Sequence, residues 1–136
     1  MRFMIIVKAT GNSEAGVMPP DEMFGVMADY HEQLAKAGAL VDASGLQPSA
    51  KGWRVKYADG KCTVTDGPFT EAKELIAGYT IIKVKSREEA VEWSRRFPNP
   101  YMTDGEIEIR QLYELEDFDG LTNVERFRAL EVASRK

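Results

Sequence analysis

The sequence predicts a single α+β domain with the split βαβ order of a ferredoxin-like sandwich and one inserted β-hairpin. Its 136 residues suit one domain, since domains commonly hold about 100–200 residues. Hydrophobic residues make up 43% of the chain, which is close to the usual globular composition. Apolar segments follow the order strand–helix–strand twice once the hairpin at 53–65 is set aside, and this order predicts the fold.

The first strand–helix–strand unit spans residues 3–46. A continuous apolar run at 3–7 predicts a strand that is covered on both faces, or nearly so. Pro20 suits the first turn of a helix and Gly38 suits its end. The apolar side chains of this helix repeat at helical spacing and are expected to form one buried stripe, namely Met23, Met27, Tyr30, Leu34 and Ala37. A weaker strand is predicted at 40–46.

A β-hairpin is predicted at 53–65. Apolar and polar residues alternate on both sides of Asp59-Gly60. An Asp-Gly pair between two alternating runs favours a tight turn, because the centre of that turn requires positive φ. The hairpin interrupts the two strand–helix–strand units without adding a domain.

The second unit begins with an apolar strand at 78–85. Ser86 and Glu89 then form a capping box, which predicts a helix that ends before Pro98. The last strand is expected at 106–113. We therefore place a domain at 1–113 and a C-terminal extension at 114–136 that carries a short helix after Thr122.

The two predicted helices can cover only one face of the sheet. The other face is also expected to be largely apolar, with Met4, Ile6, Ile82 and Val84 as candidates. A second copy of the sheet is the economical cover, and it would produce a dimeric α/β barrel. The sequence therefore predicts that the chain pairs with itself as a homodimer.

Residues 66–82 read DGPFTEAKELIAGYTII, and this segment resembles the signature of the DGPF group of the YCII-related family. The resemblance implies a ferredoxin-like fold that pairs as a dimeric α/β barrel. It also implies a gene that lies beside the gene of an extracytoplasmic-function sigma factor, as is common for the DGPF group in bacteria. The wider family implies a His–Asp pair in the barrel pocket, with the histidine on the first helix about three turns before its closing glycine. Counting back from Gly38 reaches Met27 rather than His31.

Charge and cysteine content exclude several classes of function. Eighteen basic residues against 22 acidic ones give a net charge of −4, which disfavours sequence-independent nucleic-acid binding and attachment to an anionic membrane surface. The single cysteine, Cys62, cannot form an internal disulfide, and no run of about 18 apolar residues or leader-like segment is present. We expect a cytoplasmic protein with no nucleic-acid or membrane partner.

His31 and Asp66 are the predicted catalytic residues. His31 is the only histidine and is expected at the edge of the buried helix face, where it could act as general acid or base. The alternative is a boundary histidine bonded to backbone or water. Asp66 could orient a base or a ligand, or it could serve the Asp-Gly-Pro turn through its own backbone.

Arg54, Phe69 and Tyr79 are predicted to line a ligand pocket. Arg54 could bind an anion, although a solvated strand face is the more common role. Tyr79 opens a central strand and could equally be a core residue whose hydroxyl has a partner. Zinc-ligand spacing and glycine-rich phosphate loops are both lacking, so we expect no metal and no organic cofactor.

Two functions remain open on the sequence. The first is a cofactor-independent small-molecule enzyme, isomerase-like or lyase-like, that transfers a proton in a barrel pocket. The second is a non-catalytic module that senses a small organic ligand, with the implied link to sigma-factor regulation. His31 and Asp66 distinguish the two functions, because only an enzyme needs them for turnover.

Overall fold

A four-stranded antiparallel sheet forms the centre of the computed structural model, which describes residues 1–134 and side chains up to 131. The strand order β2-β5-β1-β6 confirms the predicted ferredoxin-like arrangement. The strands are β1 (Arg2–Lys8), β2 (Leu40–Gly45), β5 (Ile76–Lys83) and β6 (Ile107–Gln111). The domain therefore belongs to the α+β class.

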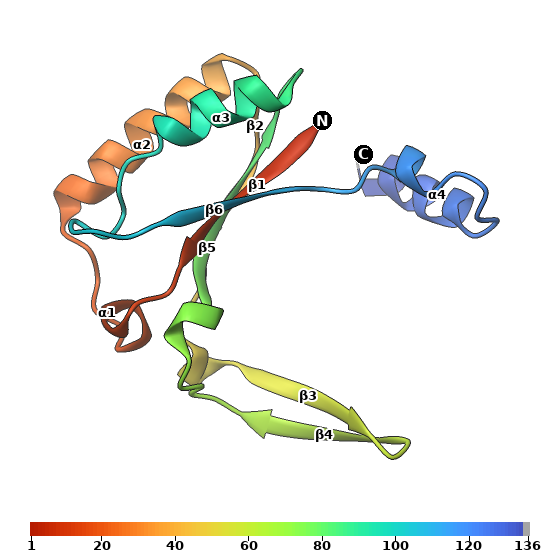
Figure 1. Cartoon of the computed structure of the whole chain (residues 1–136), viewed down its shortest axis with the longest axis horizontal. Helices are drawn as coiled ribbons and strands as arrows, with labels where there is room; N and C mark the ends of the chain where they lie inside the picture. The colour runs from red at the N-terminus through yellow and green to blue at the C-terminus, as the bar shows by residue number, and fades with distance from the viewer. Residues whose placement is uncertain (135–136) are drawn as a thin grey trace.

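Helices α2 (Asp21–Lys36) and α3 (Arg87–Arg95) cover one face of this sheet (Figure 1). The buried core lies between them and the strands, and Ile5, Leu34 and Ile82 are its fully buried large side chains. The Tyr30 hydroxyl donates a 2.7 Å hydrogen bond to the Trp93 carbonyl and so ties α2 to α3. Burial of this apolar layer supplies the main folding energy of the domain.

Short helical turns connect the main elements. The chain forms α1 (Gly11–Glu14), η1 (Ser49–Lys51) and η2 (Ala72–Glu74) in its loops. Helix α3 begins as predicted, because the Ser86 side chain accepts a hydrogen bond from the backbone N–H of Glu89. No helix in the described chain is both long and apolar enough to cross a membrane.

The second face of the sheet differs from the sequence prediction at two positions. Ile82 and Val84 lie in the core beneath the helices, and the assignment of these two residues to the opposite face was wrong. In the register of β1 with β5, Met4 faces Ile81 and therefore shares its side of the sheet. Met4, Ile6 and Ile81 form the apolar centre of this second face, which we call the open face.

The predicted hairpin is present as β3 (Trp53–Ala58) and β4 (Lys61–Asp66), which form a separate two-stranded sheet. Asp59 and Gly60 have φ values of 51° and 71°, as the tight turn requires. Figure 1 shows the hairpin projecting away from the sheet, on the side opposite α2 and α3. Every residue of both strands is exposed.

The C-terminal arm, residues 112–131, also leaves the sheet on that side (Figure 1). It contains η3 (Leu115–Phe118) and the first part of α4 (Val124–Ser134). Its root is held by an ion pair between Arg2 Nε and Glu114 Oε1 at 2.6 Å. The Leu112 N–H also donates a 2.9 Å hydrogen bond to the Arg2 carbonyl, and an ion pair of this exposure typically contributes about 0–1 kcal/mol.

Candidate functional site

A cavity of about 420 Å³ opens between α2 and the adjoining ends of β2 and β5. Met23, Phe24 and Met27 on α2 form one wall, and Phe97 and Pro100 form another. Met23 and Met27, which we expected in the core stripe, are half-buried and line this cavity. A cavity of this size is in the range that holds small organic molecules.

His31 is the polar centre of the cavity. Its Nδ1 lies 2.7 Å from the carbonyl oxygen of Met27, and its Nε2 lies 2.8 Å from the hydroxyl of Thr80. Because a carbonyl oxygen only accepts, Nδ1 must carry the proton that it donates. In the neutral ring Nε2 is therefore the free base, and the Thr80 hydroxyl donates to it. This arrangement fixes both the orientation of the imidazole and the nitrogen that can accept a proton.

Aromatic side chains hold the imidazole from one side. The ring of His31 meets Tyr30 edge-on at 5.5 Å and Phe97 edge-on at 6.3 Å between centroids. Burial raises the pKa of Tyr30 to about 12, so its hydroxyl stays neutral and bonded to Trp93. The aromatic cluster thus fixes the imidazole without adding a charge beside it.

The lining carries no Asp, Glu, Lys or Arg among the described residues. Apart from His31, the polar side chain on the cavity side of the sheet is the buried Thr80, because Ser44 and Tyr79 line the cavity from strand positions whose side chains alternate to the open face. Without an Arg or Lys partner, a carboxylate or phosphate would lose its hydration with little in return. The cavity therefore suits an uncharged and largely apolar molecule.

Of the five residues predicted for the site, the structure places His31 and Tyr79 at this cavity. The Tyr79 hydroxyl donates a 3.0 Å hydrogen bond to Asp42 on the neighbouring strand. Adjacent residues in a strand point to opposite faces, so it is Thr80, not Tyr79, whose side chain meets the imidazole. A catalytic or binding role for either predicted residue stays a prediction.

Asp66, Arg54 and Phe69 lie at the base of the hairpin and are not among the cavity-lining residues. The guanidinium of Arg54 stacks over the Phe69 ring, 3.8 Å from its centroid. In the described chain these three residues are brought near one another, away from His31. Their predicted roles at a ligand site remain untested.

The loop that follows the hairpin docks on η1. The Gly67 N–H donates to the Gly52 carbonyl at 3.0 Å, and the Phe69 N–H donates to the Ser49 hydroxyl at 3.0 Å. The Ser49 hydroxyl and N–H in turn both donate to the Glu14 carboxylate, which holds the pKa of Glu14 below its ordinary value. This network gives the DGPF segment a structural role at the hairpin base.

Thr80 is the functional residue that sequence reasoning missed. It is buried, and it supplies the hydroxyl that bonds to the free nitrogen of His31. A single threonine inside the otherwise apolar run 79–82 was the available signal. Within residues 1–134, no group of three or more His, Cys, Asp or Glu side chains could hold a metal ion.

Comparison with known proteins places the chain in a family. The model of the YCII-related domain matches residues 1–116. An uncharacterized protein of Rhizobium meliloti (strain 1021) is 32% identical over 86 residues, which are 63% of this chain and 69% of that protein. The solved structure of 5-chloro-2-hydroxyhydroquinone dehydrochlorinase from Burkholderia phenoliruptrix AC1100, bound to 2,5-dihydroxybenzoquinone, aligns with a TM-score of 0.45 and 13% identity over 84% of this chain and 95% of its own. The family match covers most of the sequence, and the chain belongs to the YCII-related family.

Proposed function

We propose that this protein is a cofactor-independent enzyme that transfers a proton on an uncharged small molecule, with His31 Nε2 as the base. One observation carries the proposal: His31 is held in an apolar cavity with Nδ1 committed to the Met27 carbonyl. The nitrogen that faces Thr80 is consequently the basic one in the neutral ring. General bases of this kind typically accelerate a reaction by about 10²–10⁴-fold.

The substrate class follows from the lining. An apolar wall without a charged side chain favours a neutral molecule that carries one acidic C–H or O–H bond. When that group reaches Nε2, it replaces the Thr80 hydroxyl as the donor to the imidazole. Thr80 is then free to hydrogen-bond an oxygen of the substrate, on which negative charge would develop.

Sensing without turnover is the second candidate, and one observation favours it. No carboxylate lines the cavity in the described chain, so the imidazolium that proton abstraction creates would lack an ionic partner there. Asp66, the carboxylate predicted to assist, lies at the hairpin base. A protein that only senses its ligand would need a cavity of matching shape and the hydrogen-bonding groups of Thr80 and His31. It would not need to transfer a proton.

Hydrogen–deuterium exchange on the ligand separates the two functions. Because His31 is the only histidine, its imidazole NMR signals report binding directly, and they serve to screen neutral carbonyl compounds and phenols. Molecules that bind are then incubated in D₂O, and deuterium uptake is followed by mass spectrometry. We expect uptake with the wild type, a loss of about 10²-fold or more with His31→Gln, and an intermediate loss with Thr80→Val. Asp66→Asn is the matched comparison outside the cavity.

The outcomes are distinct. Equal exchange by wild type and His31→Gln would overturn the enzymatic function. Binding without exchange or product for any bound molecule would favour sensing. A loss of exchange with Asp66→Asn would return Asp66 to the catalytic role predicted from the sequence.

We infer that two copies pair through their open faces in the functional protein. Met4, Ile6 and Ile81 give that face an apolar centre, with Glu108 and Arg110 beside it on β6. A monomer seldom leaves such a sheet face uncovered. Sedimentation at micromolar concentration is expected to show a dimer, and a well-folded monomer would contradict the pairing.

The exposed free thiol of Cys62 fits a reducing compartment such as the cytoplasm.

A further inference from the structure

The hairpin carries an apolar face that no described part of its own chain covers. Trp53 faces Asp66, Val55 faces Val64, and Tyr57 faces Cys62 in the β3–β4 register. Side chains of directly opposed residues share a face, so the larger ones, Trp53, Val55, Tyr57 and Val64, lie together on one side. Tyr57 is 78% exposed. An isolated two-stranded hairpin is at best marginally stable in water, and this one therefore needs a cover.

The C-terminal arm has a matching apolar surface. Phe127 and Leu130 lie three residues apart on α4 and share one side of that helix, and Phe127 is 60% exposed. Tyr113 and Leu121, in the segments before the helix, are exposed as well. Helix α4 contacts η3 of the same arm, where Arg128 pairs with Glu116 at 3.7 Å, but a helix of 11 residues is marginal in water without broader packing. Two elements of the described chain thus expose apolar side chains that further packing would stabilise.

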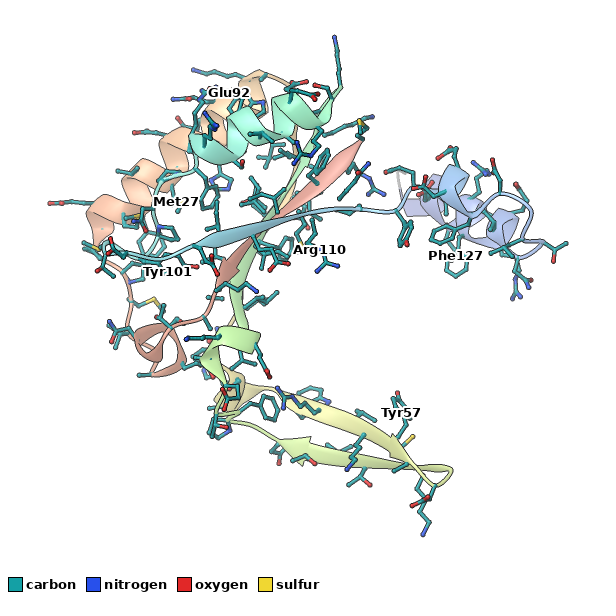
Figure 2. All side chains as sticks on the ribbon, in the orientation of Figure 1. Met27, Tyr57, Glu92, Tyr101, Arg110 and Phe127 are labelled. Carbon is teal, nitrogen blue, oxygen red and sulfur yellow. The ribbon has the colours of Figure 1, made fainter. Side chains whose placement is uncertain are left out.

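Both apolar surfaces face the same space. In Figure 2, Tyr57 rises from the hairpin toward the region of the arm, and Phe127 descends from α4 toward the region of the hairpin. The two segments leave the sheet on the side of the open face and stay apart within one chain (Figure 1). The space between them is therefore bounded by apolar side chains from both directions.

Charge indicates which segments of two copies meet. Residues 51–66 contain four basic and two acidic side chains, whereas residues 112–131 contain six acidic and two basic ones. Contact between two hairpins would bring net positive charge together, and contact between two arms would bring net negative charge together. Only a hairpin with an arm combines opposite net charges. Because Arg54, Lys56 and Lys61 lie on the hairpin face opposite Tyr57, this complementarity favours the approach of the two segments rather than adding ion pairs to the apolar contact.

We propose that the hairpin of one subunit packs its apolar face on the C-terminal arm of a second copy of this chain. A two-fold axis produces this contact twice, so the hairpin of each subunit contacts the arm of the other. The proposal rests on the inferred dimer but goes beyond the pairing of sheets. It assigns the contact to Tyr57 and Val64 on one side and to Phe127 and Leu130 on the other.

Disulfide trapping between two distinguishable chains tests the contact. Cys62 lies opposite Tyr57 on the apolar face of the hairpin and is the only cysteine. One chain keeps Cys62, and the other carries Cys62→Ser with Phe127→Cys and a tag that shifts its size. The two chains are mixed under mild denaturant, refolded and mildly oxidised. We expect most dimers that contain one chain of each kind to be joined by a disulfide between Cys62 and the cysteine at position 127. Ala129→Cys replaces Phe127→Cys as the control, because Ala129 is exposed on the other side of α4.

Each other product overturns the contact. A Cys62–Cys62 dimer as the main species would place the hairpins together, and a dimer joined through two Phe127→Cys positions would place the arms together. In a further variant that keeps Cys62 and also carries Phe127→Cys, a disulfide within the single chain would assign the cover to the chain's own arm. Equal trapping with Ala129→Cys would reveal random collision.

A parallel sedimentation measurement separates this proposal from the dimer itself. If the wild type is dimeric and no mixed disulfide forms, the hairpin–arm contact fails while the pairing of sheets stands. If the protein is monomeric, both fail, while the proposed chemistry at His31 is unaffected. As an independent check of the charge argument, Lys56→Glu with Lys61→Glu reverses the net charge of the hairpin from the face opposite Tyr57 and is expected to slow trapping, and Glu116→Lys with Asp119→Lys in the partner chain is expected to restore it.

Discussion

The two faces of the central sheet differ in where their cover comes from. Beneath α2 and α3, the side chains of Ile5 and Ile82 are fully buried by the chain's own helices. On the open face, the neighbouring residues Ile6 and Ile81 remain half-buried, and the segments beyond it expose their aromatic side chains. The same strands thus carry a completed core on one side and an uncompleted one on the other.

This difference separates folding from assembly. The helix-covered face holds the cavity and its imidazole, so the chemistry proposed for His31 needs only residues of one subunit. In the proposed dimer, the open face, the hairpin and the arm gain their packing from a second copy. Substitutions on the helix-covered face should therefore change the free energy of unfolding at every protein concentration. Substitutions on the open face should change it only at concentrations where the dimer forms.

Ile6→Lys is expected to have the largest effect, because the substitution acts twice across the two-fold axis. Glu108, which lies opposite Ile6, already pairs with Lys8 and Arg110, so the new charge would lack a free partner in the dimer. Such a charge in a buried interface destabilises it by about 3–5 kcal/mol, which corresponds to a dissociation constant raised at least about 100-fold. Sedimentation is expected to show a folded monomer, since the new ammonium lies opposite Glu108 on β6 and in water. A dimer of unchanged affinity would contradict the inferred pairing, and Ile6→Leu serves as the control.

Ile82→Ala and Ile81→Ala compare the two faces within one strand. Removing the buried Ile82 side chain is expected to lower the free energy of unfolding by about 2–5 kcal/mol at every protein concentration. Ile81→Ala is expected to destabilise only concentrated protein, where the dimer forms. Chemical denaturation at two concentrations measures both effects, and the same concentration dependence for the two variants would remove the distinction between the faces.

Sequence reasoning succeeded where a local pattern has a single physical meaning. Asp59-Gly60 predicts a tight two-residue turn because both central residues of that turn require positive φ, which Asp and Gly tolerate. Both residues have positive φ in the structure. The strand order also followed, because the spacing of strands and helices leaves few topologies. Membership of the YCII-related family was likewise predicted from the DGPF segment and confirmed.

Sequence reasoning failed where facing depends on register. The apolar residues of the run 79–84 occupy both odd and even positions, so its period of two cannot be read, and Ile82 was assigned to the wrong face. The same ambiguity hid Thr80, whose contact with His31 depends on the pairing of β5 with its neighbours. The separation of Asp66 from the cavity depends on where the hairpin projects, and no local pattern encodes that direction.

Gly67→Ala tests the root of the hairpin with a smaller expected effect. A Cβ at this position would lie 1.9 Å from the carbonyl oxygen of Ser49, which is backbone and cannot move aside without shifting η1. Overpacking of this kind destabilises by about 1–3 kcal/mol. We expect faster amide exchange at Phe69 and weaker hairpin–arm trapping, with the core unchanged. Gly11→Ala, which has open space around its Cβ, is the matched control.

Glu14→Gln is expected to have the smallest effect, seen above pH 4.5 and only at the hairpin root. The Ser49 hydroxyl and N–H stabilise the Glu14 carboxylate and lower its pKa from the ordinary value of 4.5. Because the folded pKa is the lower one, this stabilisation is complete above pH 4.5 and is lost as the pH falls through the folded value.

The wild type should therefore lose protection at the Gly67 and Phe69 amides as the solution becomes acidic, while Glu14→Gln should show weaker and nearly pH-independent protection there. Native-state hydrogen exchange, corrected for intrinsic rates, measures both. Glu108→Gln is the matched control, because Lys8 and Arg110 lower the pKa of Glu108 on the open face, away from the hairpin root. If the acid-dependent loss at Phe69 persists in Glu14→Gln but disappears in Glu108→Gln, the hairpin is held by the open face of the sheet rather than by its own root.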